Sequence, residues 1–125
     1  MRITSVRITG YGKSDTPVVA FVDVELDGQF VIHECKVLKD GNHRFVAMPS
    51  ARVTDKCPEC RARNYLEANW CNRCGVELAK GRMFHSDGRQ RELYHDLLHP
   101  LTAEFRSMLE SAVFAVLDSE TAVVI

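Results

Sequence analysis

Four cysteines in the middle of the 125-residue chain form two Cys-x-x-Cys pairs separated by ten residues: Cys57, Cys60, Cys71 and Cys74. Each pair can present two sulfurs on one side of a tight turn. Ten intervening residues suffice to bring the turns around one tetrahedral ion with Zn–S distances of about 2.3 Å. Pro58 and Gly75 fit such turns, because proline fixes a negative φ and glycine admits a positive one. The spacing predicts a metal site, and we favour one Zn²⁺ per chain.

Other chemistry of the same sulfurs stays open: a rubredoxin-like iron site, a pair of disulfides, or a redox switch that works by reversible thiol oxidation. Four thiolates would complete a tetrahedral shell and leave no position for water or substrate, so we expect a structural ion. The fifth cysteine, Cys35, lies alone in an apolar alternating run. This pattern favours metal in a reducing compartment over a disulfide framework.

The remaining candidates for catalysis are weaker. His95 and His99 are four residues apart, but Pro100 interrupts a helix there. The stretch His85–Asp87 is followed by glycine and is typical of a turn, and we expect His33 to be half-buried or at a dimer edge. The sequence has no phosphate-binding glycine loop and no paired-carboxylate motif. We therefore expect neither an enzyme nor a small-molecule substrate.

The segment that carries the cysteines, residues 53–90, has neither helical nor strand periodicity. A structural zinc contributes about 10–16 kcal/mol to the folding of a segment too small to fold by burial alone. We therefore expect a separate lobe that resembles a short zinc ribbon. In such ribbons the aromatic residue before the third cysteine, here Trp70, usually packs against the metal loop; base stacking is the alternative.

The first fifty residues predict an antiparallel meander of β-branched and aromatic runs. Asp27 and Gly28 form a strong type I′ hairpin signal, and Asp40 with Gly41 predicts the next turn. One face of the second run is apolar and should meet the core: Ala20, Val22, Val24 and Leu26.

The C-terminal part changes period. Its apolar residues recur three and four positions apart, as in an amphipathic helix: Leu101, Phe105, Met108, Leu109, Ala112, Val113, Val116 and Leu117. Pro100 and Thr102 mark the start, where Thr102 can cap free N–H groups. The fold class is therefore α+β, with a core of residues 1–52 and 91–119 and an inserted lobe of 53–90 between the fourth strand and the helix. Residues 120–125 are expected to be a tail, either frayed or an added edge strand.

Charge is unevenly distributed along the chain. The net charge is −1, yet residues 51–91 carry nine basic and five acidic side chains. A bound tetrathiolate Zn²⁺ centre carries formally −2 and reduces that local excess. No apolar run reaches the length of about eighteen residues needed to span a membrane, and no signal segment is evident at the N-terminus. We therefore expect a soluble, cytoplasmic protein that does not act on membranes.

Four motifs outside the cysteine segment resemble the SpoVG (stage V sporulation protein G, or septation protein) family. They are "MRITSVRI" at the start, "FVIHECKVL", "RFVAMPS" and "YHDLLHPLTAEFR". The resemblance implies a small homodimeric regulator that binds DNA and, in some cases, RNA, with a link to septation or sporulation. It implies contacts through basic residues after Met-Pro-Ser and at the helix start, here Arg52 and Arg106. Ala51 and His95 stand where the family usually has basic residues.

The inserted lobe directly follows Arg52 and can extend this basic surface. Its candidate nucleic-acid contacts are Arg61, Arg63, Arg73, Lys80 and Arg82. The alternative from another functional class is a protein-interaction adaptor in which the zinc ribbon docks a partner protein. The near-neutral net charge favours that alternative.

Overall fold

The computed structural model describes residues 1–123, with side chains through residue 120, and divides into two compact units. Unit 1 comprises residues 1–49 and the chain from Leu97 onward, and unit 2 comprises Ser50–Asp96. Unit 2 contains the whole expected lobe, residues 53–90, together with a short flanking stretch on each side.

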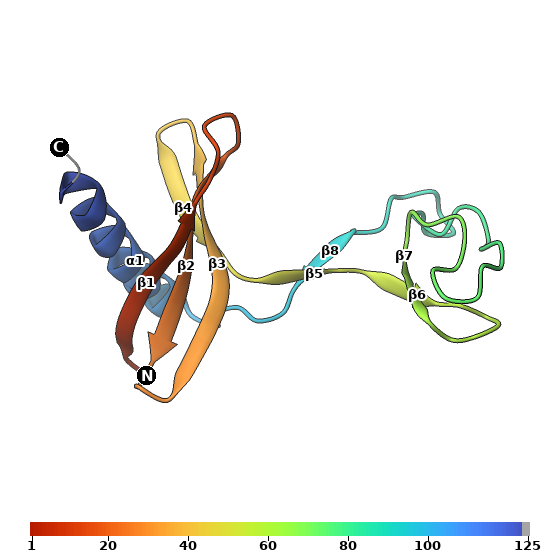
Figure 1. The fold of residues 1–125 in the computed structure, drawn as a ribbon, viewed down its shortest axis with the longest axis horizontal. Helices are drawn as coiled ribbons and strands as arrows, with labels where there is room; N and C mark the ends of the chain where they lie inside the picture. The colour runs from red at the N-terminus through yellow and green to blue at the C-terminus, as the bar shows by residue number, and fades with distance from the viewer. Residues whose placement is uncertain (124–125) are drawn as a thin grey trace. The chain divides into compact units, whose positions relative to one another are not determined.

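Unit 1 is built on one antiparallel sheet in the order β1-β2-β3-β4 (Figure 1). The strands are β1 (Ile3–Tyr11), β2 (Val18–Leu26), β3 (Phe30–Asp40) and β4 (His43–Ala47). Asp27 and Gly28 have φ values of 55° and 64° in the β2–β3 turn, and Gly41 has 61° in the β3–β4 turn. Positive φ at both central residues is what a type I′ hairpin requires. The predicted meander and both of its turns are confirmed.

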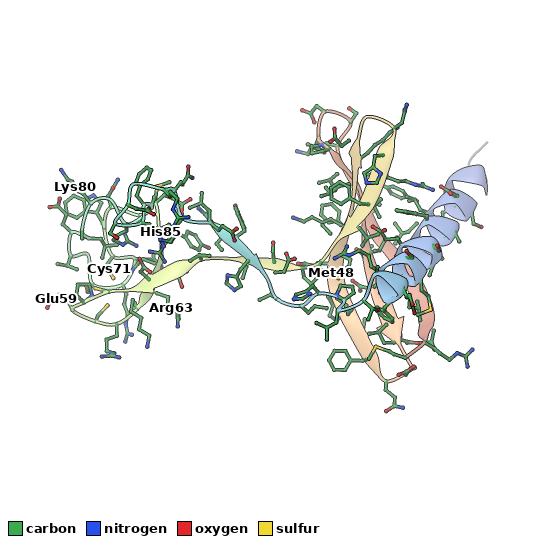
Figure 2. The ribbon with its side chains drawn as sticks, turned by 180° about the vertical axis from the view of Figure 1, so that it is seen from behind. Met48, Glu59, Arg63, Cys71, Lys80 and His85 are labelled. Carbon is green, nitrogen blue, oxygen red and sulfur yellow. The ribbon has the colours of Figure 1, made fainter. Side chains whose placement is uncertain are left out.

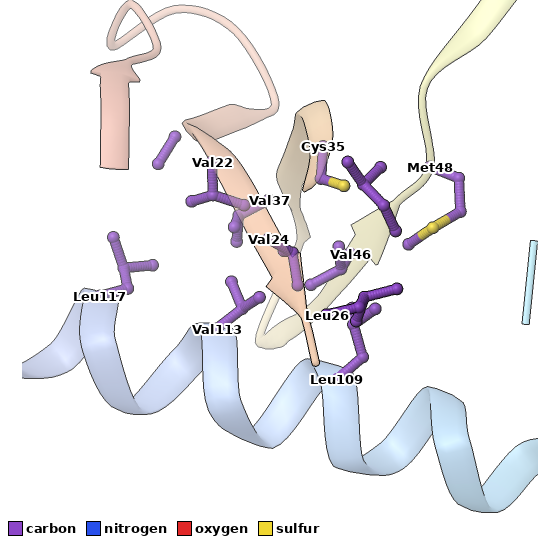
Figure 3. Packing of buried hydrophobic residues seen from close by; sticks show 12 residues of the cluster. Val22, Val24, Leu26, Cys35, Val37, Val46, Met48, Leu109, Val113 and Leu117 are labelled. Atoms are coloured by element: carbon purple, nitrogen blue, oxygen red, sulfur yellow. The ribbon is translucent and has the colours of Figure 1, made fainter. Parts of the chain in front are cut away.

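The helix α1 (Ala103–Val123) packs on one face of this sheet. Its buried side chains Leu109, Val113 and Leu117 face the apolar side chains of the strands (Figure 3). The predicted core face of β2 is confirmed, since all four of its residues are buried: Ala20, Val22, Val24 and Leu26. The predicted α+β class, with a helix packed on a meander, is therefore correct.

The predicted cap starts the helix: the N–H of Phe105 donates to Oγ1 of Thr102 at 3.1 Å. Leu101 precedes the helix and is 91% exposed, so it does not join the predicted core stripe. The helix runs on to Val123, past residue 120, where a tail was expected. Residues 124 and 125 of that tail lie outside the described residues.

Side chains of α1 bind the backbone and side chains of β4. Arg44 pairs with Asp118 through two hydrogen bonds of 2.8 Å. This pairing lowers the pKa of Asp118. The N–H of Val46 donates to Glu110 at 2.9 Å, and the carbonyl of Val46 accepts from Arg106 at 3.3 Å. β4 is an edge strand of the sheet. The helix thereby supplies hydrogen-bond partners to backbone groups of this edge, and unpaired backbone groups on an edge strand promote aggregation.

The β2–β3 pairing is interrupted by a bulge at Glu34, which has a φ of 62°. Oδ1 of the buried Asp23 accepts the N–H of Glu34 at 3.2 Å, while Oδ2 lies 3.0 Å from Nδ1 of His33 and 3.2 Å from Arg7. Burial raises the pKa of Asp23, but the hydrogen bonds outweigh it and the pKa is lowered. His33 is exposed rather than half-buried.

Unit 2 begins and ends in a two-stranded ladder in which β5 (Ser50–Arg52) pairs with β8 (Tyr94–Asp96). The next pair, β6 (Thr54–Lys56) with β7 (Arg63–Tyr65), opens the cysteine segment. The N–H of Val53 donates to the carbonyl of Leu93 at 2.8 Å, so the chain stays paired just beyond β5 and β8. Within the described part of the chain, no helix has the length and apolar character to cross a bilayer.

Candidate metal centre and basic lobe

The four predicted cysteine ligands come together in unit 2. Their sulfurs all lie within 4.8 Å of one another, with Sγ–Sγ distances of 3.7 Å from Cys57 to Cys74 and 3.5 Å from Cys60 to Cys71. A tetrahedral ion with Zn–S bonds of about 2.3 Å places its sulfurs about 3.8 Å apart. All four are free thiols. The cluster can therefore hold a metal ion, and its dimensions fit zinc.

The first cysteine turn is held by its own backbone. The N–H of Cys57 donates to the carbonyl of Ala62 at 2.7 Å, and the N–H of Arg61 donates back to the carbonyl of Cys57 at 2.9 Å. Sγ of Cys57 accepts the N–H of Glu59 at 3.4 Å. Arg61 has a φ of 66°, a left-handed conformation that costs a non-glycine residue about 1–2 kcal/mol.

The second turn repeats this pattern residue for residue. The N–H of Cys71 donates to the carbonyl of Val76 at 2.8 Å, and the N–H of Gly75 donates to the carbonyl of Cys71 at 3.1 Å. Gly75 has a φ of 79° and takes the place that Arg61 takes in the first turn. Gly75 thus adopts its positive φ without steric cost, whereas its counterpart Arg61 adopts a similar φ with strain.

Hydrogen bonds to the sulfurs favour thiolates. Sγ of Cys71 accepts from the backbone N–H groups of Cys74 at 3.5 Å and Arg73 at 3.4 Å, and from Nδ2 of Asn64 at 3.5 Å. These donors lower the pKa of Cys71 to about 5. Donors stabilise the charged form of a thiol, and a thiolate is the form that binds metal.

The fourth sulfur behaves differently. The N–H of Val76 lowers the pKa of Cys74, but burial and hydrogen bonds with the neighbouring thiol groups outweigh it and raise that pKa to about 12. Packing four sulfurs together therefore opposes complete ionisation without a cation. A divalent ion would remove that opposition, because it neutralises part of the accumulated charge.

Asn64 supports the second turn from the inside. Its side chain is buried, and Oδ1 accepts the N–H of Asn72 at 2.8 Å. Nδ2 donates to Sγ of Cys71 at 3.5 Å and to the carbonyl of Ala62 at 3.3 Å. Groups that orient metal ligands in this way strongly affect metal affinity. Asn64 was not among the predicted site residues, because its partners at positions 71 and 72 meet it only in the fold.

The apolar core around the cluster is small. It consists of the buried side chains of Cys57, Cys71 and Leu78, with a few partly buried neighbours. Two of these three residues are candidate metal ligands. Burial alone gives unit 2 little driving force, and this agrees with a lobe whose folding depends on the ion.

Four of the predicted basic contacts are exposed on the lobe: Arg61, Arg63, Arg73 and Lys80. Among residues 1–123, no carboxylate lies within ion-pair distance of these four. Figure 2 shows Arg63 and Lys80 at the outer surface of the lobe and Cys71 in its interior. Lys56, which was not among the predicted contacts, is also exposed and lies opposite Arg63 in the β6–β7 pair.

Arg52, a fifth predicted contact, already has interaction partners within unit 2. Its guanidinium lies 4.0 Å from the ring centroid of Tyr65 and 5.8 Å from that of Tyr94, and it forms an ion pair with Glu67. It therefore links the β5–β8 ladder to the cysteine lobe through cation–π contacts.

Arg82 and Arg106 have interaction partners as well. Arg82 is 14% exposed; it donates to the carbonyls of Ala68 at 2.7 Å and Tyr65 at 2.9 Å and lies 3.6 Å from Asp55. Arg106 is half-buried in unit 1, where it donates to Val46. Three of the seven predicted contacts are thus partly buried against intramolecular partners, and four are exposed; of these four, Arg63 also donates to Oγ1 of Thr54 at 3.2 Å.

Comparison with known sequences decides the family, because a match to SpoVG covers residues 1–119. The chain belongs to the SpoVG family. The septation protein SpoVG of Macrococcus caseolyticus is 28% identical over 123 residues, which cover 98% of this chain and 75% of the relative. That of Staphylococcus aureus strain NCTC 8325 is 27% identical over 124 residues, covering 99% and 87%. That of Clostridium acetobutylicum is 42% identical over 55 residues, covering 44% and 57%.

The SpoVG motif residues of unit 1 lie around one apolar hollow of about 360 Å³. Met48 of the Met-Pro-Ser motif is buried there, and Leu98, His99 and Pro100 of the second motif line the same hollow. The N–H of Leu97 donates to the carbonyl of Pro49 at 2.9 Å, which joins the two motifs directly. The motifs identified in this SpoVG sequence are therefore neighbours in the fold.

Trp70 departs from the expected arrangement. Its side chain is 61% exposed. The partly buried residues that pack on the metal cluster do not include it; they are Cys60, Ala62, Ala68 and Val76. The prediction that Trp70 packs against the metal loop is wrong: Cys71 is buried with the sulfur cluster, whereas the tryptophan beside it lies mostly at the surface.

Proposed function

We propose that this SpoVG protein is a nucleic-acid-binding regulator whose inserted lobe carries one structural Zn²⁺ and extends the basic surface. The observation that carries the proposal is the group of exposed arginine and lysine side chains around the cysteine cluster, which lack acidic partners within residues 1–123. The regulated process to examine first is septation, which the names of the relatives state. Sporulation enters only through the family resemblance.

Phosphate contacts supply the affinity in this proposal. Arg61, Arg63, Arg73 and Lys80 can each approach a phosphate, since their charged groups are exposed. Such contacts release counterions, so the binding constant should fall steeply with salt, with a slope of about −0.9 per phosphate on duplex DNA. Base readout is limited, and DNA and structured RNA are both candidates. The proposal assigns no catalysed reaction to the chain.

Zinc is the ion that best fits four thiols in reducing surroundings, such as the cytoplasm, that would keep them from forming disulfides. Cys57, Cys60, Cys71 and Cys74 would hold it, and the ion would supply the charge neutralisation that four adjacent thiolates require. Elemental analysis of the purified chain tests this part. One zinc per chain supports it, whereas iron or a metal-free chain with reversibly oxidised thiols contradicts it.

Anisotropy titrations with a labelled duplex and a labelled RNA hairpin, from about 50 to 200 mM salt, test binding. We expect simultaneous charge reversal of Arg61, Arg63 and Arg73 to glutamate to weaken binding and reduce the salt slope by about 3. The matched control reverses three exposed lysines of unit 1: Lys13, Lys36 and Lys39. Wild-type protein that shows no salt-sensitive binding to any duplex or RNA would overturn the proposal. Capture of a partner protein that survives nuclease and high salt would favour the adaptor.

Homodimerisation belongs to the same proposal, and it rests on the family resemblance. Unit 1 leaves apolar side chains exposed that a second copy could cover, among them Met1, Phe30 and Leu98, which line one hollow. Light scattering after size exclusion tests assembly. A mass of twice the 14.1 kDa chain supports the dimer, and the single-chain mass at micromolar concentration contradicts it.

A further inference from the structure

One hollow on the lobe combines exposed aromatic rings with a cation. It has a volume of about 390 Å³ and is lined by Arg63, Asn64, Tyr65, Ala68, Trp70 and Asn72. This volume falls in the range of about 300–1,000 Å³ that is usual for sites that bind small ligands or groups. None of the four cysteines lines the hollow, although Asn64, which does, also donates to Sγ of Cys71. Neither the metal centre nor the phosphate contacts account for the aromatic lining.

Trp70 stands on a rigid backbone. Its backbone forms an antiparallel β-bridge with Glu77. The next residue, Cys71, is a candidate metal ligand, and its N–H donates to the carbonyl of Val76. A residue that is 61% exposed on such a backbone loses little conformational freedom when it binds a partner. Tryptophan and tyrosine are enriched at interaction sites, and here the two lie together in one hollow.

Tyr65 is also fixed in place. The residue is 49% exposed, yet the guanidinium of Arg52 lies 4.0 Å from its ring centroid, and its carbonyl accepts from Arg82 at 2.9 Å. Arg63 lies two residues earlier in β7, so its side chain emerges on the same side of the strand. The side chain of Arg63 is exposed and donates one hydrogen bond, to Thr54 at 3.2 Å.

We propose that this hollow binds an unpaired nucleobase of single-stranded or looped nucleic acid. The base stacks on Trp70, beside Tyr65, and the adjoining phosphate lies on Arg63. The side-chain amide of Asn72 can bond the edge of the base. This inference rests on the proposed nucleic-acid function and adds to it a preference for unpaired nucleotides. The guanidinium of Arg63 in the lining favours a nucleotide over a neutral sugar or an apolar peptide segment, neither of which needs a phosphate-binding cation beside the ring.

Trp70 is the single tryptophan of the chain, so intrinsic fluorescence reports on this site directly. The zinc-loaded full-length chain is titrated with three probes: an eight-nucleotide deoxyadenylate, an abasic strand with the same number of phosphates, and a blunt duplex. We expect the deoxyadenylate to quench Trp70 fluorescence and the abasic strand to bind without quenching. Trp70→Ala, followed by anisotropy, should weaken deoxyadenylate binding about fivefold to 150-fold and leave abasic binding unchanged.

Two controls keep the result interpretable. Phe84→Ala removes an aromatic ring that is 51% exposed in unit 2 but outside the hollow, and it should leave deoxyadenylate binding unchanged. Trp70→Phe should restore most of the affinity lost in Trp70→Ala, and zinc content should be equal in all variants.

The outcomes separate this inference from the proposed function. If Trp70→Ala binds deoxyadenylate as tightly as wild type while salt-sensitive binding persists, the base-stacking site is refuted and the proposed function stands. If wild type binds no nucleic acid, both fail. Fluorescence quenching by a proline-rich peptide, without quenching by the single strand, would also overturn the assignment.

Discussion

Replacing Asn64 tests whether the lobe's hydrogen bonds tune its metal affinity. Asn64→Ala removes the donor that reaches Sγ of Cys71 at 3.5 Å and the acceptor that receives the N–H of Asn72 at 2.8 Å. A hydrogen bond to a charged group contributes about 1.5–3 kcal/mol, and an orphaned donor costs about 1–3 kcal/mol when buried. Because Asn72 is at the surface, water can replace part of the second loss, and we expect a net loss of about 2 kcal/mol.

That loss corresponds to zinc affinity about 30-fold weaker, within the range of about 10–100-fold typical of groups that orient metal ligands. Competition with a chromophoric chelator measures it. Asn64→Asp keeps the acceptor for Asn72 but places a carboxylate beside the thiolate of Cys71, so it should bind zinc more weakly than Asn64→Ala.

Asn72→Ala is the matched control, since Asn72 contributes only its backbone N–H to this network and its side chain is exposed. We expect its zinc affinity to equal that of wild type. The reasoning is refuted if Asn64→Ala holds zinc as tightly as wild type, or if Asn72→Ala loses as much.

Three further predictions concern backbone strain, the core and acid stability. Arg61→Gly relieves a φ of 66° and should tighten zinc binding about two- to fivefold in chelator competition, whereas Gly75→Ala should weaken it. Leu109→Ala opens a cavity in unit 1 and should lower its free energy of unfolding by about 2–5 kcal/mol in urea, with zinc stoichiometry unchanged. Because folding lowers the pKa of Asp23 from its ordinary 3.8, the carboxylate stabilises unit 1 above that pH, and this stabilisation is lost as pH falls through the lowered value. Urea unfolding between about pH 6 and 3 should show a larger loss in wild type than in Asp23→Asn, which keeps the smaller loss due to Asp118, whose pKa is also lowered.

Local signals in the sequence were sufficient for much of the fold. Asp27 and Gly28 specify a turn through their own backbone preferences, and Thr102 caps the helix three residues ahead of its partner. The four cysteines identify their cluster by spacing alone, because two short turns can bring their ligands together without reference to the rest of the chain. Each of these features depends on residues close together in the sequence.

The features that were missed depend on distant partners. The guanidinium of Arg52 lies over the rings of Tyr65 and Tyr94. Arg82 donates to backbone carbonyls 14 and 17 residues away. An arginine in a basic segment gives no sign of whether its guanidinium meets a phosphate or a carbonyl. The exposure of Trp70 could not be predicted for a related reason. A residue that precedes a metal ligand can face inward or outward, depending on how the two cysteine turns meet.

The ladder of β5 with β8 has a consequence for how such a chain can arise. Ser50 pairs with Asp96, Ala51 with His95 and Arg52 with Tyr94, so the two ends of the metal-binding segment leave the ladder next to each other. A short reverse turn between positions 52 and 94 would close the same ladder. A gene could therefore acquire or discard everything between those positions in a single event, with the backbone on both sides keeping its hydrogen-bonding partners.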